Sequence, residues 1–304
     1  SQSQSVLLFF LIGLVNAFGY GLYWPNRNYL ELKEIKDSSR NYYFSLINAA
    51  GWTIRALIPF VAGWFIVFGS SSGLYEIETA YWALFIFSLI LMIKAGLVIY
   101  RSKHVSPKPL FITRFNIQRF FNRRFFLNTS HGVVDGVSFI FAIIILIHLG
   151  DEGVLGTLTA IASILGSFVL YFYGKFSKET ARIKISLISN ALFIFCALGL
   201  IFLPSPINFI IYILVGSIFT SLYYIGAEPI ILAESELEIS DETEEYSVIF
   251  DNEFFLNLGR VIGIFIFVFL VYQHSQDFSL KFGPLIVGLL QLILLTFSIF
   301  IKRR

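Results

Sequence analysis

Two stretches of this chain, about 204 residues apart, repeat one pattern of proline, aspartate and arginine. The first copy contains Pro25, Asp37 and Arg55, and the second contains Pro229, Asp241 and Arg260. In both copies twelve residues lead from the proline to the aspartate, and 18 or 19 more lead to an arginine within an apolar run. Such a repeat in an apolar chain is typical of a duplicated transporter, and chance recurrence is the alternative.

The repeated arginines are the clearest candidates for chemistry. A charge at membrane depth costs about 3 kcal/mol on insertion scales, so Arg55 and Arg260 must each face a cavity or a partner. One interpretation is that they face a solute pathway and hold an anionic group or a gating carboxylate. The others are a structural pair with a loop acid, or a side chain that extends to the membrane surface.

Carboxylates near the same helix ends are further candidates. Glu228 precedes Pro229, and a carboxylate at such a loosened helix end can take up a proton as its surroundings change. The alternative is an interfacial acid paired with a loop cation. His131 and Asp135 are four residues apart and share a helix face, either as a protonatable pair at a cavity mouth or as a headgroup anchor. Two ligands without a third do not predict a metal site.

Aromatic residues accompany the first repeat. Tyr23 and Trp24 come directly before Pro25 and are the best candidates for stacking on a solute. The four tryptophans of the chain are more typical of an interfacial belt or of packing.

The composition places the chain in a membrane. Of its 304 residues 57% are hydrophobic and only 14% are charged, and the mean hydropathy is +0.77. Apolar runs of about 17–25 residues are long enough to cross a bilayer as helices. We therefore expect an all-α polytopic membrane protein. Cys196 is the single cysteine, so an intrachain disulfide is excluded.

We predict nine membrane spans. They cover approximately residues 5–24, 43–68, 79–100, 129–149, 153–173, 182–203, 206–233, 250–272 and 282–301. In each copy of the repeat we expect a helix to end near the proline and a charged loop to follow it. The basic segments 25–42, 101–124, 174–184 and 302–304 alternate with loops that lack Lys and Arg except for Lys281, which predicts a cytoplasmic C-terminus.

Two connecting segments carry strong charge patterns. Residues 110–127 alternate arginine with phenylalanine, which suits an amphipathic helix on the anionic cytoplasmic leaflet better than a nucleic-acid site. Residues 234–245 are acidic; they either pair with basic loops when a cytoplasmic gate is closed or form a solvated charge run.

The repeat also predicts helices before residue 1. Three spans precede the proline-containing span in the second half, so three matching spans are expected ahead of the first. Twelve helices in two pseudo-symmetric halves, joined by a long basic loop, resemble the major facilitator superfamily. Residues 174–184 are similar to the family's Gly-rich basic loop motif, although the acidic residue after the glycine is missing. Residues 19–25 and 44–48 resemble helices four and five of a poorly characterised bacterial branch.

The resemblance implies an organisation. Residues 1–100 would be a partial N-terminal half equivalent to helices four to six, residues 101–128 a basic amphipathic interdomain loop, and residues 129–304 the C-terminal six-helix half. The candidate pathway residues are Tyr23, Trp24, Arg55, Asp135, Glu228 and Arg260, and the candidate gate residues are Asp37, Asp241, Lys175 and Arg182.

The function that the resemblance implies is secondary active transport. A small solute would cross the bacterial inner (plasma) membrane by alternating access, with a proton or another cation as the candidate coupling ion. We expect no cofactor, no metal, no nucleic-acid partner and no enzymatic activity. The alternatives are a truncated or non-transporting membrane scaffold and, less favoured because no clustered catalytic set occurs, a membrane-embedded enzyme.

Overall fold

The computed structural model describes residues 2–101, 121–138, 152–203 and 205–301, and these are helical almost throughout. The helices are α1 (Gln2–Glu34), α2 (Asp37–Ser71), α3 (Ile77–Arg101), α4 (Arg123–Asp135), α6 (Glu152–Phe176), α7 (Arg182–Phe202), α8 (Pro206–Glu238), α9 (Glu245–Gln273) and α10 (Gln276–Phe300), with a short 3-10 turn at Glu179–Ala181. No strand occurs within these ranges. The predicted all-α class is confirmed.

Seven of these helices are long and apolar enough to span a membrane: α2, α3, α6, α7, α8, α9 and α10. Helices suit this solvent because each satisfies its own backbone groups internally. Of the other two predicted spans, residues 5–24 lie within α1, and residues 129–149 begin in α4 and continue outside the described residues. The chain is a multi-pass membrane protein.

The predicted helix ends at the two prolines are wrong. Pro25 lies inside α1, which continues to Glu34, and Pro229 lies inside α8, which continues to Glu238. A proline removes one backbone hydrogen bond but does not end a helix whose neighbours hold it in place. Here the extensions carry acids that form ion pairs, such as Glu31 with Arg27 at 2.9 Å. The α1–α2 connection is therefore only residues 35–36, and the α8–α9 connection only residues 239–244, so both are shorter than the predicted loops.

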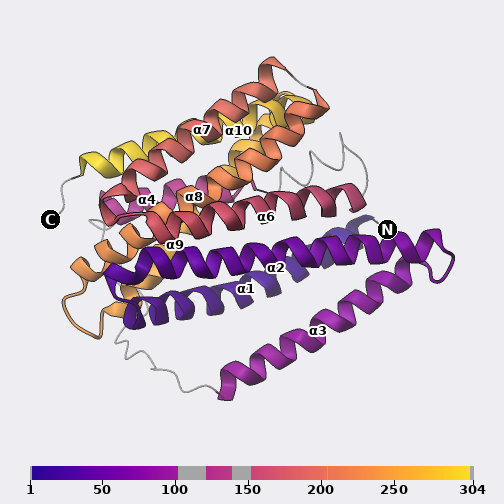
Figure 1. Cartoon of the computed structure of the whole chain (residues 1–304), viewed down its shortest axis with the longest axis horizontal. Coiled ribbons are helices and arrows are strands. Elements are labelled where there is room, and N and C mark those ends of the chain that lie inside the picture. Colours follow the sequence, from indigo (N-terminus) through magenta and orange to yellow (C-terminus); the bar gives the residue numbers. More distant parts are fainter. Residues whose placement is uncertain (1, 102–120, 139–151, 204, 302–304) are drawn as a thin grey trace.

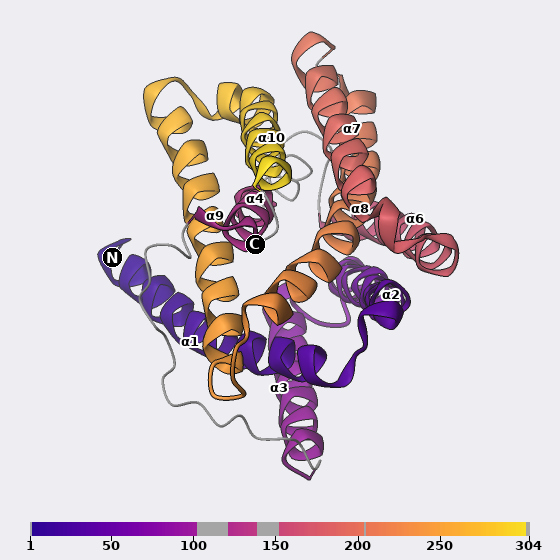
Figure 2. The same cartoon turned by 90° about the vertical axis from the view of Figure 1, so that its left-hand side faces the viewer.

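The helices run roughly along one direction (Figure 1). The α1–α2 connection contains Lys36, with Arg40 and Arg182 beside it, and we call this end of the bundle the basic end. Figure 1 shows the α1–α2 and α8–α9 connections and the end of α10 at the left, and the start of α1 and the α2–α3 connection at the right. Helix α2 packs along α6 and also contacts α8, while α1 contacts α9. In Figure 2, α4 lies beside α9 and α10.

Close helix packing in the second part of the chain depends on glycine. A Cβ atom on Gly132 would lie 2.0 Å from the Leu256 carbonyl oxygen, and one on Gly259 would lie 2.3 Å from the Thr129 carbonyl oxygen. Helices α4 and α9 therefore touch backbone to backbone, as small residues allow in membranes. This contact brings Asp135 of α4 close to Arg260 of α9.

The segment predicted to lie on the membrane surface is described only at its end. Most of residues 110–127 fall outside the described ranges. From Arg123 onward they form the start of α4, where the Arg124 side chain is fully buried.

Candidate functional site

The structure contains a polar cavity of about 600 Å³ between helices from the two parts of the chain. Its walls come from α1 and α2 on one side and from α4, α8, α9 and α10 on the other. Of the predicted pathway residues, Tyr23, Trp24, Arg55, Asp135, Glu228 and Arg260 all line it. Sequence reasoning thus selected side chains that lie around one space, although what they do there stays a prediction.

The two repeated arginines differ in their surroundings. Arg260 Nε donates to Asp135 Oδ2 at 2.6 Å, and its Nη1 donates to Asn257 Oδ1 at 3.1 Å. Arg55 is exposed to the cavity and has no ion pair within the described residues; its guanidinium lies 5.7 Å from the centroid of the Trp52 ring. One arginine is therefore neutralised and the other is not.

Two carboxylates line the cavity wall that α8 and α9 form. Glu228 has one basic group within ion-pair distance in the described structure, the His131 Nδ1 at 3.8 Å. Glu253 of α9 is largely buried and accepts a hydrogen bond of 2.6 Å from the Asn28 amide of α1. The repeat marks neither Glu253 nor Asn28, so neither is among the pathway residues predicted from the sequence. A carboxylate within an apolar helix was the signal that could have found Glu253.

Aromatic rings complete the wall near α1. Tyr23 and Trp24 pack edge to face with their ring centroids 5.3 Å apart. The Arg27 guanidinium lies 4.9 Å from the Trp24 ring centroid and pairs with Glu31 at 2.9 Å. Burial raises the pKa of Glu31, which lies beyond the predicted span, although the charge of Arg27 opposes this.

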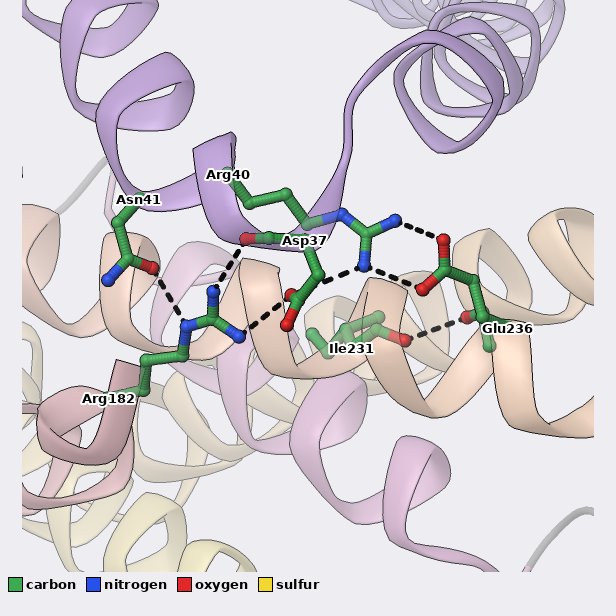
Figure 3. A network of polar contacts seen from close by, with 7 residues as sticks. Asp37, Arg40, Asn41, Arg182, Ile231 and Glu236 are labelled. Carbon is green, nitrogen blue, oxygen red and sulfur yellow. Dashed lines mark hydrogen bonds and ion pairs between the residues drawn. The ribbon is translucent and has the colours of Figure 1, made fainter. Parts of the chain in front are cut away.

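The basic end of the cavity is crossed by ion pairs (Figure 3). Arg40, fully buried at the start of α2, donates to both carboxylate oxygens of Glu236 on α8, at 2.5 and 3.0 Å. Arg182, at the start of α7, donates to Asp37 Oδ1 at 2.9 Å and to the Asn41 side chain at 2.8 Å. Asp37 also lies 3.5 Å from Arg40 Nη1, so the contacts form one network that joins α2 to α7 and α8.

The acidic segment contributes further pairs, which are Arg123 with Glu234 at 2.5 Å, Arg124 with Glu238 at 2.5 Å, and Lys33 with Glu245 at 2.6 Å. Of the two interpretations of residues 234–245, pairing with basic residues is the one that these contacts support. The hydrogen bond between Lys33 and Glu245 raises the pKa of the lysine.

Two of the four predicted gate residues meet and two do not. Asp37 and Arg182 form the ion pair described above. Asp241 accepts a hydrogen bond of 3.0 Å from Thr243 within the α8–α9 connection. Lys175 lies over the ring of the adjacent Phe176 at 5.6 Å. Sequence reasoning did not single out Arg40 or Glu236, because nothing local links residues 196 positions apart.

Seven long apolar helices, of which α2, α8, α9 and α10 line the cavity, define a polytopic membrane protein with an internal solute-sized space. Within the described residues no group of three or more His, Cys, Asp or Glu could hold a metal ion.

The family model of the Major Facilitator Superfamily matches residues 2–237, and the chain belongs to this superfamily. The chain is also similar to an uncharacterised protein, YqgE, of Bacillus subtilis (strain 168): 25% of residues are identical over 292 positions, which cover 92% of this chain. The chain spans 65% of the length of that relative. No solved structure matches this chain.

Proposed function

We propose that the protein is a secondary active transporter that moves a small solute across the bacterial plasma membrane by alternating access. The observation that carries this proposal is a polar cavity between two groups of helices whose basic end is crossed by ion pairs from one group to the other. In this arrangement α1 to α3 belong to one half, and α4 to α10 belong to the other.

The basic end faces the cytoplasm in this proposal, and the C-terminus lies there too. The Arg40–Glu236 and Asp37–Arg182 pairs then hold the cytoplasmic gate closed. A rocker-switch movement of the halves would separate α2 from α7 and α8 and break both pairs together. Because the pairs come apart only when the halves separate, their free energy sets how often the gate opens.

A proton is the coupling ion that we propose. Glu228 and Glu253 line the cavity without an arginine or lysine within ion-pair distance in the described structure. A carboxylate at membrane depth without a cation is costly, and a proton removes its charge. Protonation of Glu253 would also weaken the bond from Asn28, which joins α1 to α9.

The test needs no knowledge of the solute. In a Cys196→Ser background, Asn48→Cys places a thiol on the cavity wall, and a membrane-impermeant maleimide is applied to proteoliposomes from either side. Alternating access predicts labelling from both sides. Adding Arg40→Ala, which removes the Arg40–Glu236 pair, should raise the rate of labelling from the cytoplasmic side alone. A thiol that reacts from one side in every variant would contradict alternating access and favour a scaffold.

A further inference from the structure

The charges that line the cavity do not cancel one another. Arg260 is neutralised by Asp135, and Arg27 by Glu31. What remains in the described structure is one cation, Arg55, and the two carboxylates described above. Within the described residues, Arg55 has no carboxylate within ion-pair distance, and Glu228 and Glu253 have no arginine or lysine within it. Ionisable groups at membrane depth are retained where they act on a ligand or an ion.

The remaining charges have opposite signs on opposite walls. Arg55 belongs to α2, whereas Glu228 and Glu253 belong to α8 and α9. Arg27 and Arg260 also attract Glu253 electrostatically, but each forms its shorter contact with another carboxylate. A ligand that carried both signs would satisfy both walls at once.

We propose that the cavity takes a small zwitterionic solute of the amino-acid or short-peptide class, with its carboxylate on Arg55 and its ammonium group on Glu253 and Glu228. This inference rests on the proposed transport function and names the substrate class of the same site. A guanidinium receives a carboxylate through paired, charge-assisted hydrogen bonds, and a carboxylate is the matching partner of an ammonium group.

Charge complementarity favours the zwitterion over singly charged solutes. An organic anion would leave both carboxylates without a partner, and an organic cation would leave Arg55 without one. A zwitterion places its carboxylate on Arg55 and its ammonium group between Glu253 and Glu228. One of these two acids balances the ammonium charge, so the other can carry the coupling proton and still accept a hydrogen bond from the ammonium group. The volume of about 600 Å³ lies within the range of pockets for small ligands, about 300–1,000 Å³.

A bound zwitterion would also link the two walls. Its carboxylate would lie on α2 and its ammonium group on α8 and α9, so the filled cavity draws the halves together. Binding energy of this kind is available to shift the equilibrium between open and closed forms.

The test compares three forms of one solute on the purified protein. The twenty amino acids and dialanine are first screened by thermal shift. For each compound that stabilises the protein, calorimetry then gives the Kd of the zwitterion, of its amide and of its N-acetyl derivative. The amide lacks the negative charge and the N-acetyl form lacks the positive one. We expect each to bind about 10- to 100-fold more weakly than the zwitterion, as the strength of a charge-assisted hydrogen bond implies.

Variants of the protein test which residue binds each charged group of the solute. Arg55→Gln should weaken binding of the zwitterion and leave binding of the amide unchanged, so that the two Kd values converge. Arg55→Lys should restore part of the difference between these two Kd values. Glu253→Gln and Glu228→Gln should instead reduce the preference for the zwitterion over the N-acetyl form. Lys94→Gln, on the exposed helix α3 and outside the cavity wall, should leave every ratio as in the parent protein.

Several outcomes would overturn the assignment. If the amides, which carry only the positive charge, bind most tightly, the solute is a cation. If the N-acetyl forms, which carry only the negative charge, bind most tightly, it is an anion. Absence of any stabilising compound in the panel, or an Arg55→Gln effect of equal size on all three forms, would also overturn it. The two-sided labelling of Asn48→Cys separates the hypotheses: if it persists, the substrate class fails while transport stands.

Discussion

Loss of the Arg40 guanidinium should open the cytoplasmic gate. Arg40 is fully buried and donates to both oxygens of Glu236, while the Glu236 side chain is 45% exposed. Exposed pairs contribute up to about 1 kcal/mol and removal of one partner of a buried pair costs about 3–5 kcal/mol. Solvent screening at Glu236 places this pair between these limits, at about 2 kcal/mol.

A change of about 2 kcal/mol corresponds to about a 30-fold shift in the gate equilibrium. The assay is the rate at which a maleimide added from the cytoplasmic side labels Asn48→Cys. When opening and closing are fast, this rate follows the open population, so Arg40→Ala should raise it about 30-fold. Lys36→Ala is the matched control, because Lys36 is an exposed cation four residues before Arg40, in the α1–α2 connection, without an ion pair in the described structure.

The same pair can be tested for specificity with a double-mutant cycle. If Arg40 holds the gate through Glu236, then Arg40→Ala and Glu236→Ala together should raise the rate little more than Arg40→Ala does alone. A labelling rate for Arg40→Ala within twofold of the parent, in a protein with unchanged helix content, would refute the reasoning. Additive effects of the two variants would assign Arg40 another role.

Three further changes have defined outcomes. Arg182→Gln should raise the same labelling rate by less than Arg40→Ala does, because Arg182 contacts one carboxylate oxygen of Asp37 whereas Arg40 contacts both carboxylate oxygens of Glu236; an equal or larger rise would contradict this order. Gly132→Ala should cost about 1–3 kcal/mol of unfolding free energy, because its methyl group would meet the backbone of α9; Gly19→Ala, with nothing within 4 Å, should not lower the melting temperature, and equal effects would exclude backbone contact as the cause. Burial raises the folded-state pKa of Glu31 above its usual 4.5, so the stabilisation from its protonated form is present below that value and is lost as pH rises through the folded pKa. Glu31→Gln should therefore flatten the fall in melting temperature with rising pH; an unchanged slope would show that Glu31 does not cause it.

The sequence by itself determined the membrane class and the positions of most spans. An apolar run such as residues 79–100 specifies a membrane helix because its backbone satisfies its own hydrogen bonds and its side chains face lipid, which requires no distant partner. The spacing of Pro, Asp and Arg also selected Arg55 and Arg260, both of which line one cavity. Helix ends were less determined, since whether a helix continues beyond Pro25 or Pro229 depends on its neighbours.

Only the tertiary structure decided which charges are paired. The repeat makes Arg55 and Arg260 equivalent, yet α4 supplies Asp135 to Arg260, and no carboxylate in the described residues reaches Arg55. Arg40 meets Glu236 across 196 positions of sequence. The energy of a charge depends on the atoms within a few ångströms of it, and packing of distant helices chooses those atoms. Hydropathy is a property of each segment, whereas charge pairing is a property of the assembled bundle.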